Sequence, residues 1–317
     1  METPNLVGAA GEILLARPRG FCAGVERAIA MVELALKKFG PPIYVKHAIV
    51  HNRHVVEGLR KRGAVFVEEM GEIPRGARVI FSAHGVSPAV WQEARERGCE
   101  VLDATCPLVT KVHGEARRFA AEGRTIFLIG HREHVEVVGT LGEAPENITV
   151  VGSVAEAERV RARNPREVAC LTQTTLSLDD ARAIVMILQR RFPALAFPRK
   201  DDICFATQNR QNAVAALCRE SELILVVGSP DSSNSNRLVE VARAGGVEAH
   251  LVESWREVED SWLAGVRGIG VTAGASAPEE VVQELVDRLS QKTGAAVREI
   301  EVAREDVNFA LPPQLAG

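Results

Sequence analysis

The amino-acid sequence predicts an α/β protein built from three similar units, each with a small parallel sheet. Two observations carry this prediction. Short apolar runs of strand length alternate along the chain with segments of helical periodicity, a pattern typical of parallel sheets joined by helices. The same order of apolar run, cysteine and polar clusters also recurs three times, with a period of about 90–100 residues, which indicates an internal repeat.

Three cysteines mark the repeat: Cys22, Cys106 and Cys204. Each follows a short apolar run that predicts a strand, and after each one apolar residues recur at every third or fourth position, which predicts a helix. The match to helical periodicity is looser after the third cysteine. The apolar runs before the cysteines are residues 12–16, 101–102 and 195–197.

Two polar positions follow each cysteine, both of them just beyond an apolar run. The first lies 29, 28 and 28 residues after the cysteine in the three units, and the second lies 62, 68 and 72 residues after it. Chance placement can produce one such agreement, but both agreements in all three units indicate a weak triplication. The first positions are His51, His134 and Ser232, and the second are His84, Thr174 and Ser276.

The repeat predicts where a functional site would form. In parallel sheets, ligand-facing groups gather where strands end and helices begin. Three such edges facing one point would give a single central site with three thiolates and a ring of His, Ser, Thr and Asn side chains. The expected units are residues 12–105, 106–203 and 204–290, and residues 291–317 form a C-terminal extension that can add an edge strand. No function is assigned to residues 1–11.

Composition excludes several classes of protein. The net charge is −4 with both signs interspersed, so no basic surface for nucleic acid or anionic lipid is expected. The longest apolar runs, such as residues 223–227, are far shorter than the ~20 residues of a membrane span. Residues 1–11 contain no basic residue and no apolar core, so a secretory signal is not expected either. A cytoplasmic location follows as the expectation.

The cysteine spacing favours an iron–sulfur cluster. The chain has six cysteines but no C-x2-C pair, which argues against zinc ribbons and ferredoxin-type clusters. Structural zinc needs four ligands, whereas three thiolates suit a cluster in which one iron has no protein ligand. A cysteine at a helix start is also biased toward the thiolate by the helix dipole. The remaining three are expected to be structural: Cys99, Cys170 and Cys218.

The polar ring suits a diphosphate ligand, whose oxygens are all hydrogen-bond acceptors. The donors comprise three histidines together with Ser232, Asn234 and Ser276. No phosphate-binding loop of the G-x-x-x-x-G-K-[ST] type is present, so nucleotide binding is disfavoured. Glu136, two residues beyond His134, is a candidate proton donor, although an isolated glutamate is more often a solvated surface residue.

Eight ordered motifs resemble one known family, the iron–sulfur reductases of 4-hydroxy-3-methylbut-2-enyl diphosphate. The resemblance runs from about Ile13 to about Val307. The motifs are Arg17–Val25, His51–Arg53, Phe81–Val86, Asp103–Val109, Thr172–Ser177, Asp201–Cys204, Ser232–Leu238 and Val271–Pro278.

The resemblance implies a trefoil of three pseudo-threefold-related α/β domains around a central 4Fe-4S cluster. It assigns the cluster to the three repeat cysteines, Cys22, Cys106 and Cys204, with the substrate hydroxyl at the iron that has no protein ligand. Air would convert such a cluster to a 3Fe-4S form. It also implies Glu136 as the proton source, with Thr174 near the hydroxyl. The implied diphosphate site comprises His51, His84, His134, Ser232, Ser233, Asn234 and Ser276.

The implied reaction is the last step of the methylerythritol phosphate pathway. Two electrons and two protons remove the hydroxyl as water, and the products are isopentenyl and dimethylallyl diphosphates. The expected electron donor is reduced ferredoxin or flavodoxin. Two positions depart from the family pattern. Val135 replaces a common proline, which puts the rigidity of its loop in doubt, and Phe205 replaces a common tyrosine.

Three other functions compete with this interpretation. A cluster-dependent hydro-lyase would also act on a hydroxyl at an open iron, but would need no external reductant. A non-catalytic redox or iron sensor would need a partner surface, for which the charge pattern offers no basic stripe. A simple anion-binding module would be colourless when purified without oxygen.

Overall fold

A computed structural model describes residues 11–315 of the chain. The chain divides into two compact units. The first unit comprises Met1–Cys22, His51–His54 and Phe205–Val307, and the second comprises Ala23–Val50, Val55–Cys204 and Asn308–Gly317. Together they contain three sheets in which every strand pairing is parallel, so the predicted α/β class with three parallel sheets is confirmed.

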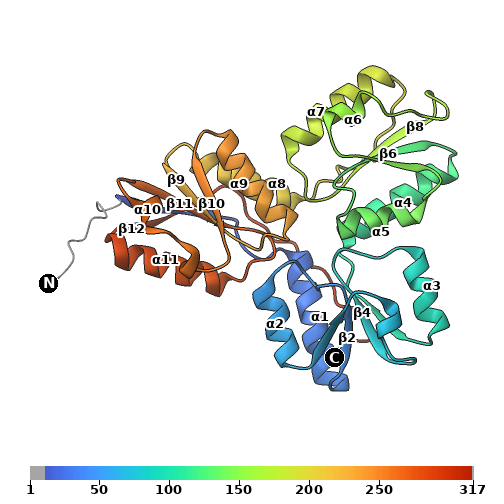
Figure 1. Cartoon of the computed structure of the whole chain (residues 1–317), viewed down its shortest axis with the longest axis horizontal. Helices are drawn as coiled ribbons and strands as arrows, with labels where there is room; N and C mark the ends of the chain where they lie inside the picture. Colours follow the sequence, from blue (N-terminus) through green and yellow to red (C-terminus); the bar gives the residue numbers. More distant parts are fainter. Residues whose placement is uncertain (1–10, 316–317) are drawn as a thin grey trace. The chain divides into compact units, whose positions relative to one another are not determined.

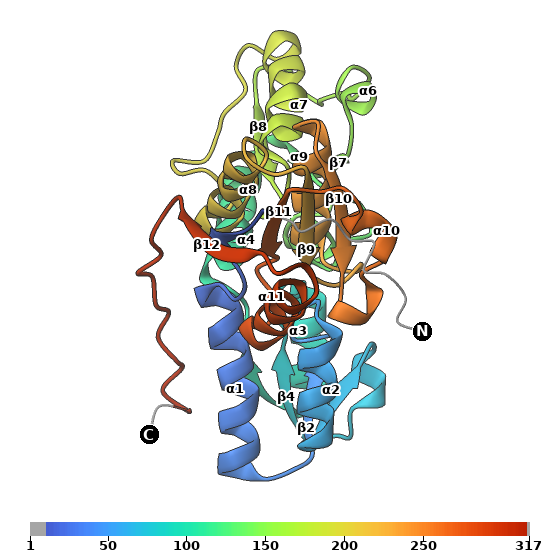
Figure 2. The same ribbon diagram turned by 90° about the vertical axis from the view of Figure 1, so that its left-hand side faces the viewer.

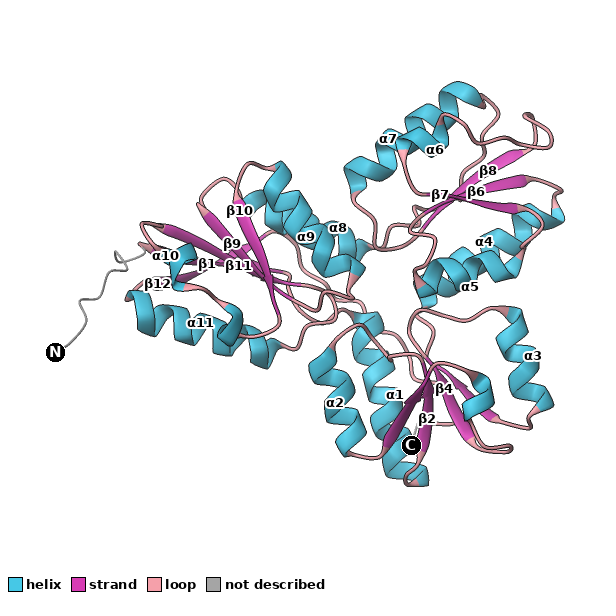
Figure 3. Ribbon diagram, viewed as in Figure 1, coloured by secondary structure: helices cyan, strands magenta, loops and turns pink. Residues whose placement is uncertain are grey.

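The first unit contains a five-stranded sheet with the order β10-β9-β11-β1-β12 (Figures 1 and 3). The strands in this order are Glu248–Val252, Leu223–Val227, Gly268–Ala273, Glu12–Arg17 and Ala296–Glu301. The helices are α8 (Phe205–Leu217), α9 (Ser233–Ala244), the short α10 (Asp260–Leu263) and α11 (Glu279–Thr293), with a 3-10 turn at Trp255–Glu257.

Helices cover both faces of this sheet, which explains why its central strands are apolar throughout. In β9, Leu223 and Leu225 pack into a buried cluster that includes α11, while Ile224 and Val226 pack into a cluster that includes α8 and α9. Strands buried on both faces need no polar alternation. The run Leu223–Val227 is therefore a core strand, as its length predicted.

The first strand of the chain belongs to the last sheet. β1 pairs with β11 on one side, where Leu14 faces Gly270, and with β12 on the other, where Leu14 faces Arg298. The sequence prediction groups residues 12–16 with the segment that follows them, whereas β1 pairs with strands from the C-terminal part of the chain. Strand order in a parallel sheet is decided by long-range packing, which neighbouring residues in the sequence do not reveal. The expected edge strand in the C-terminal extension is confirmed as β12.

The second unit contains two sheets. One has the order β3-β2-β4-β5 and the other the order β7-β6-β8. The strands of the four-stranded sheet are Ala64–Val67, Ile43–Lys46, Arg78–Phe81 and Glu100–Asp103, and those of the three-stranded sheet are Ile148–Val151, Thr125–Ile129 and Val168–Thr172. The helices are α1 (Ala23–Phe39), α2 (Arg53–Lys61), α3 (Pro88–Glu96), α4 (Pro107–Ala121), α5 (Val135–Glu143), α6 (Val154–Ala157) and α7 (Leu178–Arg191), with a 3-10 turn at Met70–Glu72.

One extended segment beside each sheet leads into a cysteine. β5 precedes Cys106 and β1 precedes Cys22. Beside β8, Ala196 forms a single parallel bridge with Ala169, and its segment leads to Cys204. The structural repeat is therefore offset from the predicted one, because each cysteine follows the sheet of the preceding repeat. The trefoil arrangement and the boundaries at residues 105/106, 203/204 and 290/291 remain proposals.

The C-terminal segment lies beside α1 in the second unit (Figure 2). The Arg27 Nε–H donates to the Ala310 carbonyl at 2.9 Å, and the Lys38 ammonium donates to the Gln314 carbonyl at 2.8 Å. Leu315 is buried. Within residues 11–315, no helix is both long enough and apolar enough to cross a membrane.

Candidate functional site

The three repeat cysteines occupy equivalent positions. Each stands directly before a helix, and Cys106 is the N-cap residue of α4. The backbone N–H of each cysteine donates a hydrogen bond to a backbone carbonyl of another repeat. Each accepting residue lies two positions beyond the end of a strand, at or next to the second polar position of that repeat. The acceptors are Ala275 for Cys22 (3.2 Å), Ala83 for Cys106 (3.0 Å) and Thr174 for Cys204 (3.1 Å). The structure therefore places each cysteine beside a predicted polar position, which supports the triplication.

The other three cysteines have the surroundings of structural residues. Cys170 is buried, and burial raises the pKa of its thiol. Burial also raises the pKa of Cys218, which packs against the apolar cluster of α8 and α9. Cys99 packs against the apolar cluster of the four-stranded sheet. The three repeat cysteines are partly exposed, as Cys99 and Cys218 are, but only these three stand directly before a helix, where thiolates are favoured.

A buried carboxyl lies beside two of the predicted site residues in the second unit, Thr174 and His134. Glu136, in the first turn of α5, is 3% exposed. Its Oε1 accepts a hydrogen bond from the Thr174 backbone N–H at 2.6 Å, and its Oε2 accepts one from the Thr174 hydroxyl at 2.8 Å. Because the Thr174 carbonyl binds the Cys204 N–H, the carboxyl is two hydrogen bonds away from a cysteine backbone.

Burial raises the pKa of Glu136 to about 7, and the two hydrogen bonds from Thr174 only partly oppose this effect. The charge of His113 also lowers the pKa, while that of Asp202 raises it. A carboxyl with a pKa near neutrality holds a proton that it can transfer at physiological pH. An isolated glutamate is usually a solvated surface residue, but Glu136 is buried, so that interpretation is wrong for it.

The raised pKa predicts a pH-dependent stability. The folded state binds the Glu136 proton more tightly than the unfolded chain, so this stabilisation is complete below pH 4.5 and is lost as the pH rises through about 7. Glu136→Gln does not titrate. The free energy of unfolding of the variant, relative to wild type, should therefore increase by about 2.5 kcal/mol between pH 5 and pH 8, measured by denaturant unfolding.

Glu133→Gln is the matched control, because Glu133 is an exposed glutamate in the loop before α5. Its stability relative to wild type should be the same at both pH values. An equally flat result for Glu136→Gln would contradict the raised pKa.

His134 and His84 lie near this carboxyl. The Nδ1 of His134 accepts the Glu136 backbone N–H at 3.2 Å and caps α5, which leaves Nε2 as the proton-bearing nitrogen of the neutral ring. The ring of His84 stands edge-on to that of His134, with centroids 6.1 Å apart, and its Nδ1 lies 3.2 Å from the Ser82 hydroxyl. Val135 is the first residue of α5 and directly follows the His134 cap. The start of a helix therefore fixes the backbone here, although the proline common in the family is absent.

The first unit gathers the other predicted polar residues around residues 274–276. The Ser276 hydroxyl donates to the His51 carbonyl at 3.0 Å and lies 3.4 Å from the Ser232 hydroxyl. The Asn234 Oδ1 accepts the Ala275 N–H at 2.8 Å. Since the Ala275 carbonyl also binds the Cys22 N–H, these polar residues and one cysteine share a single turn.

The start of α9 supplies part of this group. Ser232 is its N-cap residue, and Ser233 is its first helical residue. The N-terminus of a helix favours anions, since its backbone N–H groups and dipole present partial positive charge. The predicted residues thus form two sets. The first unit holds Cys22, His51, Ser232, Ser233, Asn234 and Ser276, and the second holds Cys106, Cys204, His84, His134, Glu136 and Thr174.

A buried charged network beside Glu136 was missed from the sequence. The His113 Nδ1 lies 2.9 Å from a carboxylate oxygen of Glu143, whose other oxygen accepts from Arg117 at 2.8 Å. The ring of His113 also packs close to Gly85, next to His84, and to Gly139 on α5. Its signal in the sequence, a histidine seven residues after Cys106, is too common to interpret alone.

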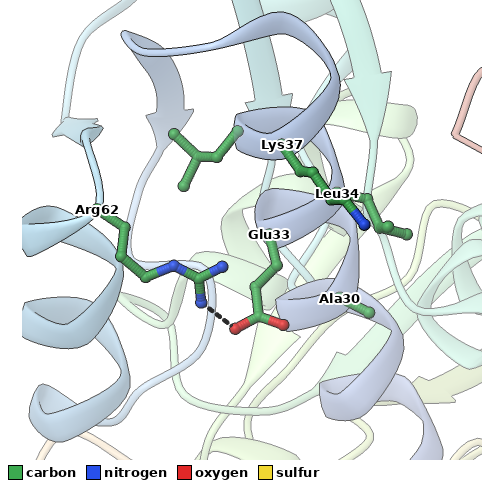
Figure 4. A pocket seen from close by; sticks show the side chains of 6 residues that line it. Ala30, Glu33, Leu34, Lys37 and Arg62 are labelled. Carbon is green, nitrogen blue, oxygen red and sulfur yellow. Dashed lines mark hydrogen bonds and ion pairs between the residues drawn. The ribbon is translucent and has the colours of Figure 1, made fainter.

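In the part of the chain that the structure describes, neither a single-metal site nor the surface pocket along α1 involves the predicted residues. Among residues 11–315, no group of three or more His, Cys, Asp or Glu side chains is placed to hold a metal ion. A pocket of about 550 Å³ lies along α1 (Figure 4), where Glu33 forms an ion pair with Arg62 beside Lys37. None of the predicted site residues lines this pocket.

The chain is similar to one protein family over most of its length. A family model described as LytB protein matches residues 13–290. A 4-hydroxy-3-methylbut-2-enyl diphosphate reductase of Azoarcus sp. (strain BH72) is 55% identical over 96% of this chain and 97% of its own length. A protein of the same name from Bordetella bronchiseptica is 54% identical over 100% of this chain and 97% of its own length.

Two solved structures are also similar. The E-1-hydroxy-2-methyl-but-2-enyl-4-diphosphate reductase from Plasmodium falciparum superposes with a TM-score of 0.94 at 40% identity, over 96% of this chain and 97% of that one. A structure of (E)-4-hydroxy-3-methyl-but-2-enyl diphosphate reductase, described as the terminal enzyme of the non-mevalonate pathway, gives a TM-score of 0.63 at 28% identity, over 89% and 99%.

Proposed function

The chain belongs to the LytB family, and from this premise we propose that it reduces 4-hydroxy-3-methylbut-2-enyl diphosphate at the last step of the methylerythritol phosphate pathway. The C–O bond to the hydroxyl breaks, two electrons and two protons are consumed, and water leaves. The products are isopentenyl and dimethylallyl diphosphates. The observation that carries this proposal is the buried, protonatable carboxyl of Glu136 beside the Cys204 loop.

The cofactor of this reaction would be a 4Fe-4S cluster held by Cys22, Cys106 and Cys204. Thiolates are the protein ligands of such clusters, and these three cysteines share the same backbone anchoring at a helix start. When bound, the cluster would relay the two electrons one at a time from an external donor and would offer a Lewis-acidic iron without a protein ligand. Reduced ferredoxin or flavodoxin would be the donor, in the cytoplasm.

The side chains of the chain itself would bind the diphosphate and supply the proton. The hydroxyls and amides around residues 274–276 and the N-terminus of α9 offer donors to phosphate oxygens. The histidines His84 and His134 add donors in the second unit. Glu136 would hold the proton on a carboxyl oxygen next to the Thr174 hydroxyl, which orients it. Hydroxide is a poor leaving group, so protonation at this step lowers the barrier.

The diphosphate site predicts a loss of binding in three variants. His51→Ala, Asn234→Ala and Ser276→Ala each remove a side chain from the polar group and should raise the KM for substrate and the inhibition constant for inorganic diphosphate. A lost charge-assisted hydrogen bond corresponds to about 1.5–3 kcal/mol, or about tenfold or more in affinity. Inhibition by inorganic diphosphate measures this directly.

Ser261→Ala is a control, because this exposed hydroxyl lies on α10 and donates to the exposed Glu259. It should leave diphosphate inhibition unchanged. If all three site variants behaved like this control, the polar group around residues 274–276 would not be the anion site.

The reaction class is tested with protein purified without oxygen. The visible and electron-spin-resonance spectra report the cluster, and a colourless protein would favour the anion-binding module. Turnover that depends on dithionite or reduced ferredoxin supports the reductase, whereas turnover without any reductant would identify a hydro-lyase.

A further inference from the structure

The structure contains three cations that bind the backbone before the repeat cysteines, and no motif or family resemblance pointed to them. Arg27 lies five residues after Cys22, Lys111 lies five residues after Cys106, and Arg210 lies six residues after Cys204. Each stands near the start of the helix that its cysteine precedes. Each donates to carbonyls in the loop that ends at a different cysteine, and Arg210 also donates to the Ala206 carbonyl in its own helix.

We use the name clamp for each of these cations together with its contacts to the backbone. The Arg27 clamp binds the loop before Cys106. One Nη donates to the Thr105 carbonyl at 3.2 Å, and the other lies 3.4 Å from the Asp103 carbonyl. The Nε–H holds the C-terminal segment at Ala310. The guanidinium therefore joins α1, the end of β5 and the C-terminal segment within the second unit.

The Lys111 clamp acts on the loop before Cys204. Its ammonium donates to the carbonyls of Lys200 and Asp201, the second at 2.7 Å, and forms an ion pair with Asp202 at 2.9 Å. Asp202 is buried and also accepts the Thr172 N–H at 3.1 Å. The three donors of one ammonium are thus directed at three consecutive residues, which end two positions before the cysteine.

The Arg210 clamp acts on the loop before Cys22. Nη2 donates to the Gly20 carbonyl at 2.7 Å and to the Phe21 carbonyl at 3.2 Å, and Nε donates to Gly20 at 3.1 Å. The side chain is fully buried, with Glu305 at 3.1 Å as its ion-pair partner. Burying a guanidinium is costly unless its donors are satisfied, so this arrangement would not persist as an incidental surface contact.

We propose that Arg27, Lys111 and Arg210 are positioning residues for the metal cluster, each fixing the loop of the next cysteine in the cyclic order 22, 106, 204. The inference rests on the proposed function, in which these cysteines hold the cluster. Fixing a carbonyl fixes the peptide plane that leads into the cysteine, because the peptide bond is planar. Two of the cations also form ion pairs with carboxylates, but all three reach backbone oxygens within the four residues before a repeat cysteine.

The test uses the cluster-loaded protein under anaerobic conditions. In Arg27→Met and Lys111→Met the long apolar stem is kept and the charge is removed, so packing is preserved. Iron release to a chelator should become about tenfold faster, the scale of one or two lost charge-assisted hydrogen bonds. A thiol-alkylating reagent present during release then shows, by peptide mass spectrometry, which cysteine is freed first.

The expected order separates this proposal from a general loss of stability. Arg27→Met should free Cys106 first, although Arg27 is nearer in sequence to Cys22, and Lys111→Met should free Cys204 first. Lys111→Arg should restore slow release. Lys37→Met on α1 and Arg118→Met on α4 are matched controls, because both side chains lie on the same helices away from the cysteine loops, and they should release iron at the wild-type rate.

Arg210→Met can fail to fold because it empties a buried ion-pair site, so Arg27 and Lys111 decide the outcome. Iron release at the wild-type rate in both variants, or the same order of cysteine alkylation in both, would contradict the positioning role proposed for the clamps. Neither result would argue against the cluster itself. Wild-type protein that binds no cluster would instead overturn the proposed function, and with it the role given to the clamps.

Discussion

Replacing Cys106 with Ser is expected to abolish turnover and to leave the purified protein largely depleted of iron. The serine hydroxyl does not ionise near neutral pH, whereas iron–sulfur clusters are held by thiolates. Cys22→Ser and Cys204→Ser should have the same effect, since the backbone anchoring of the three cysteines is equivalent. Iron and sulfide content, the visible spectrum and dithionite-driven turnover, all under anaerobic conditions, measure the result.

Cys99→Ala and Cys218→Ala serve as controls, because both residues pack against apolar clusters. Both variants should keep the cluster and the activity, and so should Cys170→Ala, apart from some loss of stability in the core. In the wild type, air should bleach the protein toward a 3Fe-4S form, since one iron would have no protein ligand. Full cluster content in Cys204→Ser would refute the ligand set derived from the triplication.

Glu136→Gln is expected to lower turnover by ~10²-fold or more, the usual scale for loss of a general acid. Glutamine keeps the shape of the side chain and can still accept the Thr174 N–H, but it has no acidic proton to donate. Cluster content and diphosphate inhibition should stay near wild type. Single-turnover product formation with prereduced protein separates the proton transfer from electron delivery.

The control for this variant is again Glu133→Gln, which should turn over at the wild-type rate. In the wild type, the single-turnover rate should also fall as the pH rises above about 7, because the protonated carboxyl is then lost. Near-normal single-turnover rates in Glu136→Gln would mean that another group, such as the Thr174 hydroxyl through water, delivers the proton.

The sequence predicted much of this structure because its repeat is carried by local patterns. Strand-length apolar runs, helical periodicity and polar residues at strand ends are all visible within short windows, so Cys22, Cys106 and Cys204 could be assigned to helix starts correctly. The central strand β9 was equally clear, since a run buried on both faces is apolar throughout. The role of Glu136 depended on family resemblance, because burial of a single glutamate leaves no pattern in its neighbours.

Long-range contacts could not be predicted in the same way. Arg27 and Lys111 resemble ordinary surface cations in the sequence, and their partners lie 78 and 90 residues away. The residues next to Arg210 in the sequence do not indicate that its side chain is completely buried. The pairing of β1 with β11 and β12 depends on which strand fills the last place in the sheet, and the sequence near Glu12 carries no information about that.

The position of β1 has a consequence for synthesis of the chain on the ribosome. β1 is the first strand to be made, yet its neighbours in the sheet, β11 and β12, are among the last segments to be translated. The two sheets of the second unit are encoded between them and can form while translation continues. Strand β1 has no sheet to join until the C-terminal third emerges. Cys22, the first of the three proposed cluster ligands to be synthesised, therefore follows a strand that can pair only near the end of translation.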